Sequence, residues 1–278
     1  AHAQDAQDAQ DTDEVIVSAD GAILLDTLMV TATKRDEDPF EIDGAVEVAK
    51  PENLTPRNFI KFNQLDRVFA DVNIRQRSSR AYSNITIRGQ SSVDFYNPTA
   101  QVLVDGLPQD QTSFAQLLPQ GLEQVELLYG PQGTLYGRNA IGGVFNIVTR
   151  KPDDVFRFDA TAAYGNLEYD GAMLVNVPIV PDALFADFAI AGLKEEGEYE
   201  QMVTGDDIGD TDDWNGRVRV RFAPSDSPWD IMLSAAHDDV SSDEEQYVPE
   251  AFFDQRIALP LDSHYTLETN SYGATVSY

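Results

Sequence analysis

The second half of the chain alternates between apolar and polar residues, and this pattern limits the possible folds more than any other feature. In "WNGRVRVRF" (214–222), Val218, Val220 and Phe222 share one face of an extended strand, and three arginines share the other. A period of two residues is typical of a β-strand whose two faces meet different surroundings. Six such segments follow one another, with aromatic residues concentrated at their ends: 155–164, 168–177, 184–193, 214–222, 229–235 and 271–278.

The connections between these segments differ in length on the two sides. "PIVPDA" and "APSDSP" are short, the acidic connections over 195–213 and 239–267 are long, and the first long-side connection, near Gly165, is a short exception. A soluble sandwich also alternates. However, short turns on one side, long loops on the other, terminal aromatics and a lumen-like arginine face favour an outer-membrane barrel. We therefore expect residues 153–278 to form about six antiparallel transmembrane β-barrel strands.

Six strands do not close a barrel that is wide enough to hold a folded domain. Outer-membrane barrels with a plugged lumen have about 22 strands. At about 20 residues per strand and connection, roughly 300–400 further residues would be needed after Tyr278. The sequence therefore predicts that this chain is a fragment of a longer protein.

The composition excludes several functional classes. The chain has no cysteine, which excludes disulfides, thiolate zinc sites and cysteine-ligated iron–sulfur clusters. No apolar run reaches the roughly 18 residues of a membrane helix. The net charge of −29, most of it in residues 151–278, argues against nucleic acid and against simple attraction to an anionic membrane surface.

Residues 36–152 have a different character and predict a compact α+β domain. "NLTPRNFIKFNQLDRVFADV" suggests a core helix with Thr55 as N-cap and Pro56 at its first position. Short strands bounded by turn residues follow at "VNIRQR", "SNITIRGQ", "QVLVDGLP", "QVELLYG" and "GGVFNIVTR".

The stretch "GPQGTLYGRNAIGGVFNIVTR" (130–150) is rich in glycine and ends in a β-branched strand. A phosphate-binding loop requires Lys and Ser/Thr after its glycines, where this chain has Gly143 and Val144. A dinucleotide fingerprint places a strand before the glycines and a helix after them, which is the reverse of the order here. We therefore expect the glycines to permit tight turns and close backbone packing near a barrel wall.

These motifs resemble those of the TonB-dependent outer-membrane transporters over nearly the whole chain. "LEQVELLYGPQGTLYGRNAIGGVFNIVTRKP" is similar to the C-terminal signature of their plug domain, and "NITIRGQ" and "VLVDGLP" match two further plug motifs. Tyr129 departs from the pattern, since arginine is common there. The resemblance implies an N-terminal α+β plug domain (36–152) followed by the barrel. Its motif positions are Ile87, Arg88, Gly89, Asp105, Gly106, Gly130, Pro131, Gly133, Tyr136, Gly137, Arg138, Gly142 and Gly143.

"DTLMVTATKR" (26–35) resembles the TonB box, which pairs with the periplasmic domain of TonB by strand addition. A short, alternating apolar segment has free backbone groups for such pairing. "EVIV" (14–17) is an alternative box, and an ordinary edge strand of the plug is another reading. The polar tail 1–25 is expected to be disordered, and its Ala1-His2-Ala3 has the form of an export-signal remnant. The residues of the favoured box are Asp26, Thr27, Leu28, Met29, Val30, Thr31 and Ala32.

The remaining charged residues are expected to have structural roles. By the resemblance, Arg88 and Arg138 would face acidic groups on the barrel wall, since a buried arginine requires a carboxylate. "GDDIGDTDDWNG" (205–216) is expected to be a solvated acidic loop, with calcium binding as the alternative. His237 and its acidic neighbours are not expected to bind a metal. No catalytic residue and no cofactor is predicted.

The resemblance implies energised import of a scarce ligand, with a ferric siderophore as the commonest cargo, and TonB, outer-membrane lipid and an iron chelate as partners. Cobalamin, haem or carbohydrate are alternative ligands. A passive porin would lack the plug motifs. A soluble enzyme or binding module built from an α+β core and a β-sandwich would remain in aqueous fractions without detergent.

Overall fold

The fold was described from a computed structural model of the 278-residue chain. The structure describes residues 30–31, 44–54, 61–77, 79–92, 97–109, 117–137, 139–197, 199–243, 248–255, 257–259 and 264–278. The predicted tail and all of the predicted box except Val30 and Thr31 lie outside these residues, as does the alternative box at 14–17.

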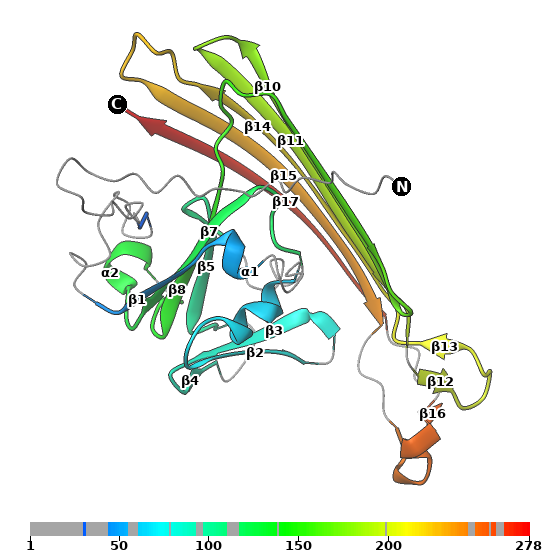
Figure 1. The fold of residues 1–278 in the computed structure, drawn as a ribbon. Helices are drawn as coiled ribbons and strands as arrows, with labels where there is room; N and C mark the ends of the chain where they lie inside the picture. The colour runs from blue at the N-terminus through cyan, green and yellow to red at the C-terminus, as the bar shows by residue number, and fades with distance from the viewer. Residues whose placement is uncertain are drawn as a thin grey trace, which may run out of the picture.

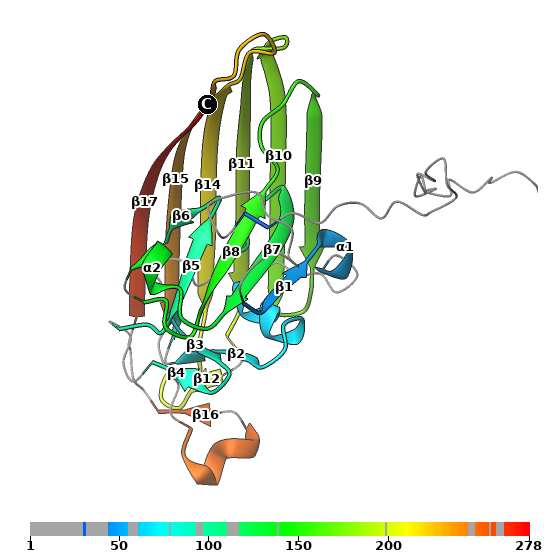
Figure 2. The ribbon, with the colours of Figure 1, turned by 90° about the vertical axis from the view of Figure 1, so that its left-hand side faces the viewer.

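Six long strands form one antiparallel sheet, called the wall below (Figure 2). The strand order is β17-β15-β14-β11-β10-β9, so strands that are neighbours along the chain pair with each other. Pairing continues further than the alternation indicates, and β15 extends to Asp243 instead of residue 235. The strands are β9 Arg157–Tyr164, β10 Glu168–Val180, β11 Leu184–Glu195, β14 Thr211–Phe222, β15 Asp230–Asp243 and β17 His264–Ser277.

The two faces of the wall have the alternating character that the sequence predicts. On β11, Ala189, Ala191 and Leu193 are buried, whereas Phe188 and Ile190 point outward and are exposed. Soluble monomers rarely expose a continuous apolar surface of this kind. The outward face also carries exposed Phe158, Val177, Ile179, Val218, Val220, Phe222, Leu233 and Val276.

The long connections gather at one end of the wall, and the short turns 181–183 and 223–229 lie at the other (Figure 1). Strands from both long connections pair with each other in a small sheet of order β13-β12-β16. The Met202 N–H also donates to the Ala258 carbonyl at 3.0 Å. These elements are β12 Tyr199–Gln201, β13 Asp207–Ile208, η3 Glu250–Gln255 and β16 Ile257–Ala258.

The N-terminal α+β domain, called the plug below, lies against the inner face of the wall (Figures 1 and 2). Its main sheet has the order β1-β7-β8-β5-β6, in which only β5 and β8 pair in parallel. A second sheet has the order β2-β3-β4. The strands are β1 Val46–Ala49, β2 Val72–Arg77, β3 Ser79–Ile87, β4 Gln90–Ser91, β5 Ala100–Val104, β6 Leu107–Pro108, β7 Leu122–Tyr129 and β8 Gly143–Thr149.

Helical structure is sparser than the sequence predicts. In place of a long helix from Thr55, the described residues contain α1 (Pro51–Leu54) and a 3₁₀ helix, η2 (Phe62–Arg67), while Thr55 and Pro56 lie outside them. Phe62, Leu65 and Val68 recur every three residues, which is the 3₁₀ period. A further short helix is α2 (Gly133–Tyr136). Within the described ranges, no helix has the length and apolar character of a membrane span.

The plug core joins η2 to the central strands of the main sheet. The Phe145 ring of β8 meets the rings of Phe62 and Phe69 edge-on, with centroids 5.5 and 5.6 Å apart. Val125, Leu127, Phe145 and Ile147 have no exposed surface. Strands β7 and β8 therefore form the rigid centre of the domain.

The glycine-rich stretch makes tight turns within the plug, as predicted, and its packing near the barrel wall stays a prediction. Gly130 has φ +85° in the turn after β7, a conformation that favours glycine. A Cβ on Gly143 would lie 2.6 Å from the Leu128 carbonyl oxygen on β7, which is too close for any side chain. A Cβ on Gly133 would meet no described atom within 4 Å, so glycine is not required there.

The chain passes from plug to wall between Thr149 and Arg157. Asn176 of β10 is buried and donates to the carbonyl oxygens of Asp153 and Val155, at 3.1 and 2.6 Å. The Arg157 guanidinium forms an ion pair with the Asp153 carboxylate at 2.8 Å. Burial raises the pKa of Asp153, but the hydrogen bonds and charge from Arg157 and the Val155 N–H outweigh it, so the pKa lies below its usual range.

Candidate functional site: the docked N-terminal segment and the plug–wall contact

Val30 and Thr31, the two described residues of the predicted TonB box, lie on the main sheet of the plug. The Val30 side chain has no exposed surface, and the residue forms a β-bridge. It packs in an apolar cluster with strands β5, β7 and β8, made of Leu103, Leu128, Ala140 and Val144. The segment is therefore held through a buried side chain.

Thr31 is bound to a buried carboxylate. Both its backbone N–H and its hydroxyl donate to Oε1 of Glu126, at 2.9 and 3.1 Å. Glu126 lies on β7 and has no exposed surface. Gln124 Nε2 donates to the same oxygen at 2.6 Å. Hydrogen bonds to a charged acceptor are stronger than those between neutral groups.

Asn146 of β8 completes this arrangement, which is called the Glu126 network below (Thr31, Gln124, Glu126 and Asn146). Its amide nitrogen donates to Glu126 Oε2 and to the Thr31 hydroxyl, both at 3.0 Å. Its amide oxygen accepts from the Gly106 N–H at 3.2 Å. Burial and the negative charge of Glu126 raise the pKa of the neighbouring Tyr136 phenol to about 12. Glu126 therefore binds Thr31 of the N-terminal segment and raises the pKa of Tyr136, which packs against the apolar cluster around Val30.

A second buried cluster joins plug and wall. Arg219 of β14 is fully buried, and its guanidinium binds Asp187 of β11 through Nε and Nη2. Its Nη1 reaches the plug, donating to Asp105 Oδ2 at 3.0 Å and Thr149 Oγ1 at 2.6 Å. Its Nη2 also donates to the Arg150 carbonyl at 2.6 Å. Arg219 thus joins one carboxylate of the wall, Asp187, to one carboxylate of the plug, Asp105.

Asp105 and Gly106 form the turn between β5 and β6. Their φ values are +50° and +77°, as a two-residue hairpin turn requires. The Asp105 carboxylate also accepts from the Thr149 N–H at 2.8 Å and the Thr149 hydroxyl at 2.9 Å. The "VLVDGLP" motif therefore places an acidic residue where the wall arginine meets the plug.

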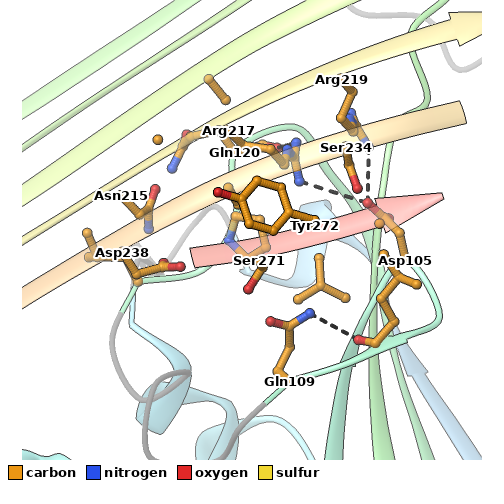
Figure 3. Close-up of a pocket in the computed structure, with 18 of the residues that line it drawn as sticks. Asp105, Gln109, Gln120, Asn215, Arg217, Arg219, Ser234, Asp238, Ser271 and Tyr272 are labelled. Atoms are coloured by element: carbon orange, nitrogen blue, oxygen red, sulfur yellow. Dashed lines mark hydrogen bonds and ion pairs between the residues drawn. The ribbon is translucent and has the colours of Figure 1, made fainter. Parts of the chain in front are cut away.

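Arg217 lies beside Arg219 and lines a cavity of about 230 Å³ between plug and wall (Figure 3). It donates to the Gln120 carbonyl at 2.9 Å and to the Thr149 hydroxyl at 3.2 Å. Leu107 of the plug fits against Gly273 of β17, where any Cβ would collide with it. Polar groups from Asn215, Ser234, Asp238 and Ser271 also line this cavity.

Arg88 packs on an aromatic ring of the plug, and its expected contact with wall carboxylates stays a prediction. Its guanidinium carbon lies 4.2 Å from the centre of the Tyr129 ring, and no described ion pair joins it to the wall. Tyr129 donates from its hydroxyl to the Ala70 carbonyl at 2.7 Å, and burial and Glu47 raise its pKa. Arg138 lies outside the described residues.

The described plug–wall ion pairs run in both directions. Arg217 and Arg219 of the wall face Asp105 of the plug. The plug supplies the cation in the other pairs, where Lys61 binds the wall carboxylates of Glu168 and Glu195 at 2.6 and 3.0 Å.

Acidic residues at the long-connection end of the wall are hydrogen-bonded. Asp243 Oδ2 accepts from the backbone N–H groups of Gly209 and Asp210, at 2.9 and 3.2 Å, and His264 Nδ1 lies 3.1 Å from Asp243 Oδ1. His237 contacts Asn270 and the Trp214 ring. A search of the described residues found no group of three or more His, Cys, Asp or Glu that could hold a metal ion.

Neither the Glu126 network nor the partners of Arg219 were predicted from the sequence. Glu126 and Asn146 lie within the apolar runs "VELLY" and "VFNIV", and a polar residue in such a run is a usable signal of a buried polar contact. Their contacts were not predictable, because Thr31 is 95 residues from Glu126 along the chain.

Comparisons with known proteins agree with this fold. The family model for the TonB-dependent Receptor Plug Domain matches residues 38–144. The pesticin receptor of Yersinia pestis is 34% identical over 227 residues, which cover 80% of this chain and 33% of that protein. The vitamin B12 transporter BtuB of Vibrio vulnificus is 25% identical over 62% of this chain and 28% of its own length. The chain spans about a third of the length of the curated relatives it matches.

Solved structures also match the chain. The ferric yersiniabactin uptake receptor FyuA from Yersinia pestis superposes with a TM-score of 0.74 at 30% identity, covering 84% of this chain and 38% of that one. The ferric citrate transporter FecA superposes with a TM-score of 0.65 at 18% identity, covering 84% of this chain and 37% of that one. The second match shows a shared fold alone: an N-terminal plug followed by antiparallel strands of a barrel wall.

Proposed function

Because this chain belongs to the TonB-dependent receptor family, we propose that the protein imports a scarce ligand, a ferric siderophore, across the bacterial outer membrane with energy delivered through TonB. Its relatives are named as receptors and transporters and not as enzymes. The observation that carries the proposal is the plug seated on the inner face of the wall and bound there by Arg219.

A plug fixed in this way favours gated import over passive diffusion. A buried arginine of the wall pairs with Asp105 of the plug, and breaking this contact separates Asp105 from its nearest cation. Moving the plug therefore requires energy from outside the receptor. A passive porin would not need a plug that is bound to the wall in this way.

The ferric siderophore is favoured as ligand by the similarity to a pesticin receptor and to a ferric yersiniabactin uptake receptor. The vitamin B12 transporter matches at lower identity and over less of the chain, which makes cobalamin the first alternative ligand. The paired outer connections, β12, β13 and β16, are proposed to contribute to the external ligand site. Their excess of carboxylates disfavours strongly anionic cargo at short range.

For TonB, the proposed pairing segment is Asp26–Ala32. The proposed domain division places the segment at 26–35, the plug at 36–152 and the wall strands at 153–278. The division is supported by the last plug strand, which ends at Thr149, and by the first wall strand, which begins at Arg157. The exposed apolar face of the wall supports contact with outer-membrane lipid.

Uptake of iron tests this proposal in a strain that lacks the gene and is complemented with the full-length gene product. Labelled iron is supplied as a panel of ferric siderophores, with labelled cyanocobalamin and haemin as comparators. The wild type and Leu28→Ala are expected to take up iron. Leu28→Pro is expected to lose uptake, because proline removes a backbone donor that strand addition needs.

The same variants give the contrary outcomes. Iron uptake that persists in a strain without TonB would show a passive pore. Uptake of cyanocobalamin alone would replace the ligand class. Equal binding of Leu28→Pro and Leu28→Ala to the TonB periplasmic domain would remove residues 26–32 as the pairing segment.

A further inference from the structure

We propose that Asp243 is a positioning residue that joins the two long connections of the wall into one preassembled unit of the external ligand site. The first long connection is residues 196–210, and the second is residues 244–263. The inference rests on the proposed role of these connections in ligand binding, and it adds which residue holds them together before a ligand arrives. It is carried by the contacts of Asp243 and by the sheet β13-β12-β16.

Asp243 is the last residue of β15, where the second connection leaves the wall. Its Oδ2 accepts the N–H groups of Gly209 and Asp210, at the end of the first connection, at 2.9 and 3.2 Å. Its Oδ1 lies 3.1 Å from Nδ1 of His264, the first residue after the second connection. The Asp243 N–H also donates to the Asp210 carbonyl at 2.9 Å. One residue therefore ties the end of the first connection to both ends of the second.

The His264 ring is held on both of its nitrogen atoms. Its Nε2 lies 2.9 Å from Ser241 Oγ, and its Nδ1 faces Asp243. The three side chains share one face of the wall, because Ser241 and Asp243 are two residues apart on β15 and Asp243 pairs with His264 across the strands. Asp243 therefore fixes the imidazole and, with it, the start of β17.

The two connections also pair with each other beyond the end of the wall (Figure 1). Strand β12 of the first connection pairs in parallel with β16 of the second, where Glu200 lies opposite Ile257. The Met202 N–H donates to the carbonyl of Ala258, a residue with no exposed surface. The strands of this sheet have only two or three residues each. So small a sheet is marginal by itself, and it therefore depends on how the ends of the connections are anchored.

The first connection is closed at the residue that Asp243 binds. Asp210 Oδ1 accepts the Gly197 N–H at 2.8 Å, which brings the beginning of the connection to its end. A Cβ on Gly197 would collide with the Ile208 carbonyl oxygen, so the backbone approaches closely there. Since Asp243 binds the N–H of Asp210, loss of its carboxylate loosens the closed first connection and the second connection together.

A ligand site built from two connections binds best when they are already held together. If the connections separate in the free protein, the ligand must order them on binding, and its affinity falls by that cost. The apparent Kd then rises in inverse proportion to the assembled fraction. Asp243 lies at the long-connection end of the wall and does not contact the plug in the described residues, so its loss affects ligand binding and leaves the later steps of transport unchanged.

Hydrogen exchange of the purified full-length gene product tests the joint without a ligand. Asp212→Ala is the control for Asp243→Ala, because it removes the same charge from an exposed pair with Lys194 at 3.9 Å, which contributes little. We expect exchange in peptides from both connections to rise about tenfold or more in Asp243→Ala alone, as the loss of two hydrogen bonds to a carboxylate implies. A rise in one connection only, or equal rises in both variants, would overturn the joint. If Asp243→Ala is not recovered folded, Asp243→Asn is read in the same way.

Uptake of the siderophore panel described above separates positioning from direct contact with the ligand. In Asp243→Ala we expect KM to rise about fivefold with an unchanged maximal rate, and in Asp212→Ala we expect the wild-type KM. Glu200→Cys with Ile257→Cys then links the paired strands of the two connections by a disulfide, and Ile257→Cys alone is its control. In the Asp243→Ala background, the oxidised pair is expected to return KM to within about twofold of the wild type. A verified disulfide that does not lower KM would show that Asp243 does not act by joining the connections.

The exchange experiment contains neither siderophore nor TonB, so it separates this inference from the proposed function. Joint loosening of both connections in Asp243→Ala, with no uptake of any siderophore by the wild type, would leave the joint in place and refute the proposed function. Uptake by the wild type with an unchanged KM in Asp243→Ala would leave the proposed function in place and refute Asp243 as a positioning residue.

Discussion

Two buried polar clusters hold the plug region together, and they differ in their chemistry. At the wall, Arg219 is bound by Asp187 of the wall and by Asp105 of the plug, so separating plug from wall breaks a buried contact between opposite charges. At the N-terminal segment, the one carboxylate of Glu126 remains on the plug, and the group that leaves, Thr31, is neutral. Removing a buried charge from its partner costs far more than removing a neutral donor.

The comparison teaches how one domain can be both fixed and releasable. The wall cluster binds the plug through opposite charges, whereas the Glu126 network binds a neutral residue of a short segment. Both clusters depend on β8, through Thr149 and Asn146 respectively. The following predictions test whether their strengths differ as their chemistry indicates.

The largest effect is expected for Arg219→Met. The variant leaves Asp187 buried without its cation and removes the nearer of the two arginines that face Asp105, which costs about 3–5 kcal/mol. Hydrogen exchange of the peptide covering Gly143–Thr149 is then expected to accelerate about a hundredfold or more. Arg221→Met is the control, because Arg221 and Asp230 lie in a partly exposed pair, where the loss is about 0–1 kcal/mol. Equal effects of the two variants would remove the wall cluster as the stronger anchor.

A smaller effect that reaches both clusters is expected for Gly143→Ala. The new Cβ would lie 2.6 Å from the Leu128 carbonyl oxygen, so β8 must shift, at a cost of about 1–3 kcal/mol. Gly133→Ala is the matched control, because its Cβ meets no described atom within 4 Å. Exchange of peptides from β8 and around Thr31 is expected to rise together in Gly143→Ala only. A rise at one cluster alone would show that β8 does not join them.

The smallest effect is expected for the partly exposed ion pair of Asp153, which lies in the connection between plug and wall. Its pKa is lowered in the folded protein, so its contribution is complete above the unfolded value of about 3.9 and is lost as the pH falls through the folded value. Since the ion pair with Arg157 is partly exposed, the loss is below about 1 kcal/mol. Exchange around residues 150–156, corrected for intrinsic rates, is expected to rise below about pH 4 in the wild type but not in Asp153→Asn. An identical pH profile for the two would contradict this.

The wall was the most predictable part of the molecule, because a strand with one buried and one exposed face must alternate. Val218 and Arg219 have opposite environments for this reason alone. The partners of Arg219 were not predictable, because Asp105 lies 114 residues away and its position depends on how the plug sits. A long α-helix was predicted where the structure has the 3₁₀ helix η2, because residues spaced three apart fit a 3₁₀ turn as well as an α-helix. The glycine at 143 was recognised as sterically required, but its neighbour is Leu128 and not the wall.

Val30 and Thr31 are docked on the plug and must leave it before they can pair with TonB. Two buried asparagines allow a direct test of this requirement. Asn146 binds the Glu126 network, and Asn176 binds the plug-to-wall connection; both are almost fully buried. When only released receptor binds TonB, the apparent Kd rises in inverse proportion to the released fraction. Asn146→Ala weakens docking and leaves residues 26–32 unchanged.

The measurement is the Kd of the TonB periplasmic domain for the full-length protein in nanodiscs, with Asn176→Ala as the control. The account predicts that Asn146→Ala binds TonB about three- to tenfold more tightly than the wild type, as the loss of one or two hydrogen bonds to the docked segment implies. It also predicts that Asn176→Ala binds as the wild type does. An unchanged or weaker affinity in Asn146→Ala would contradict it.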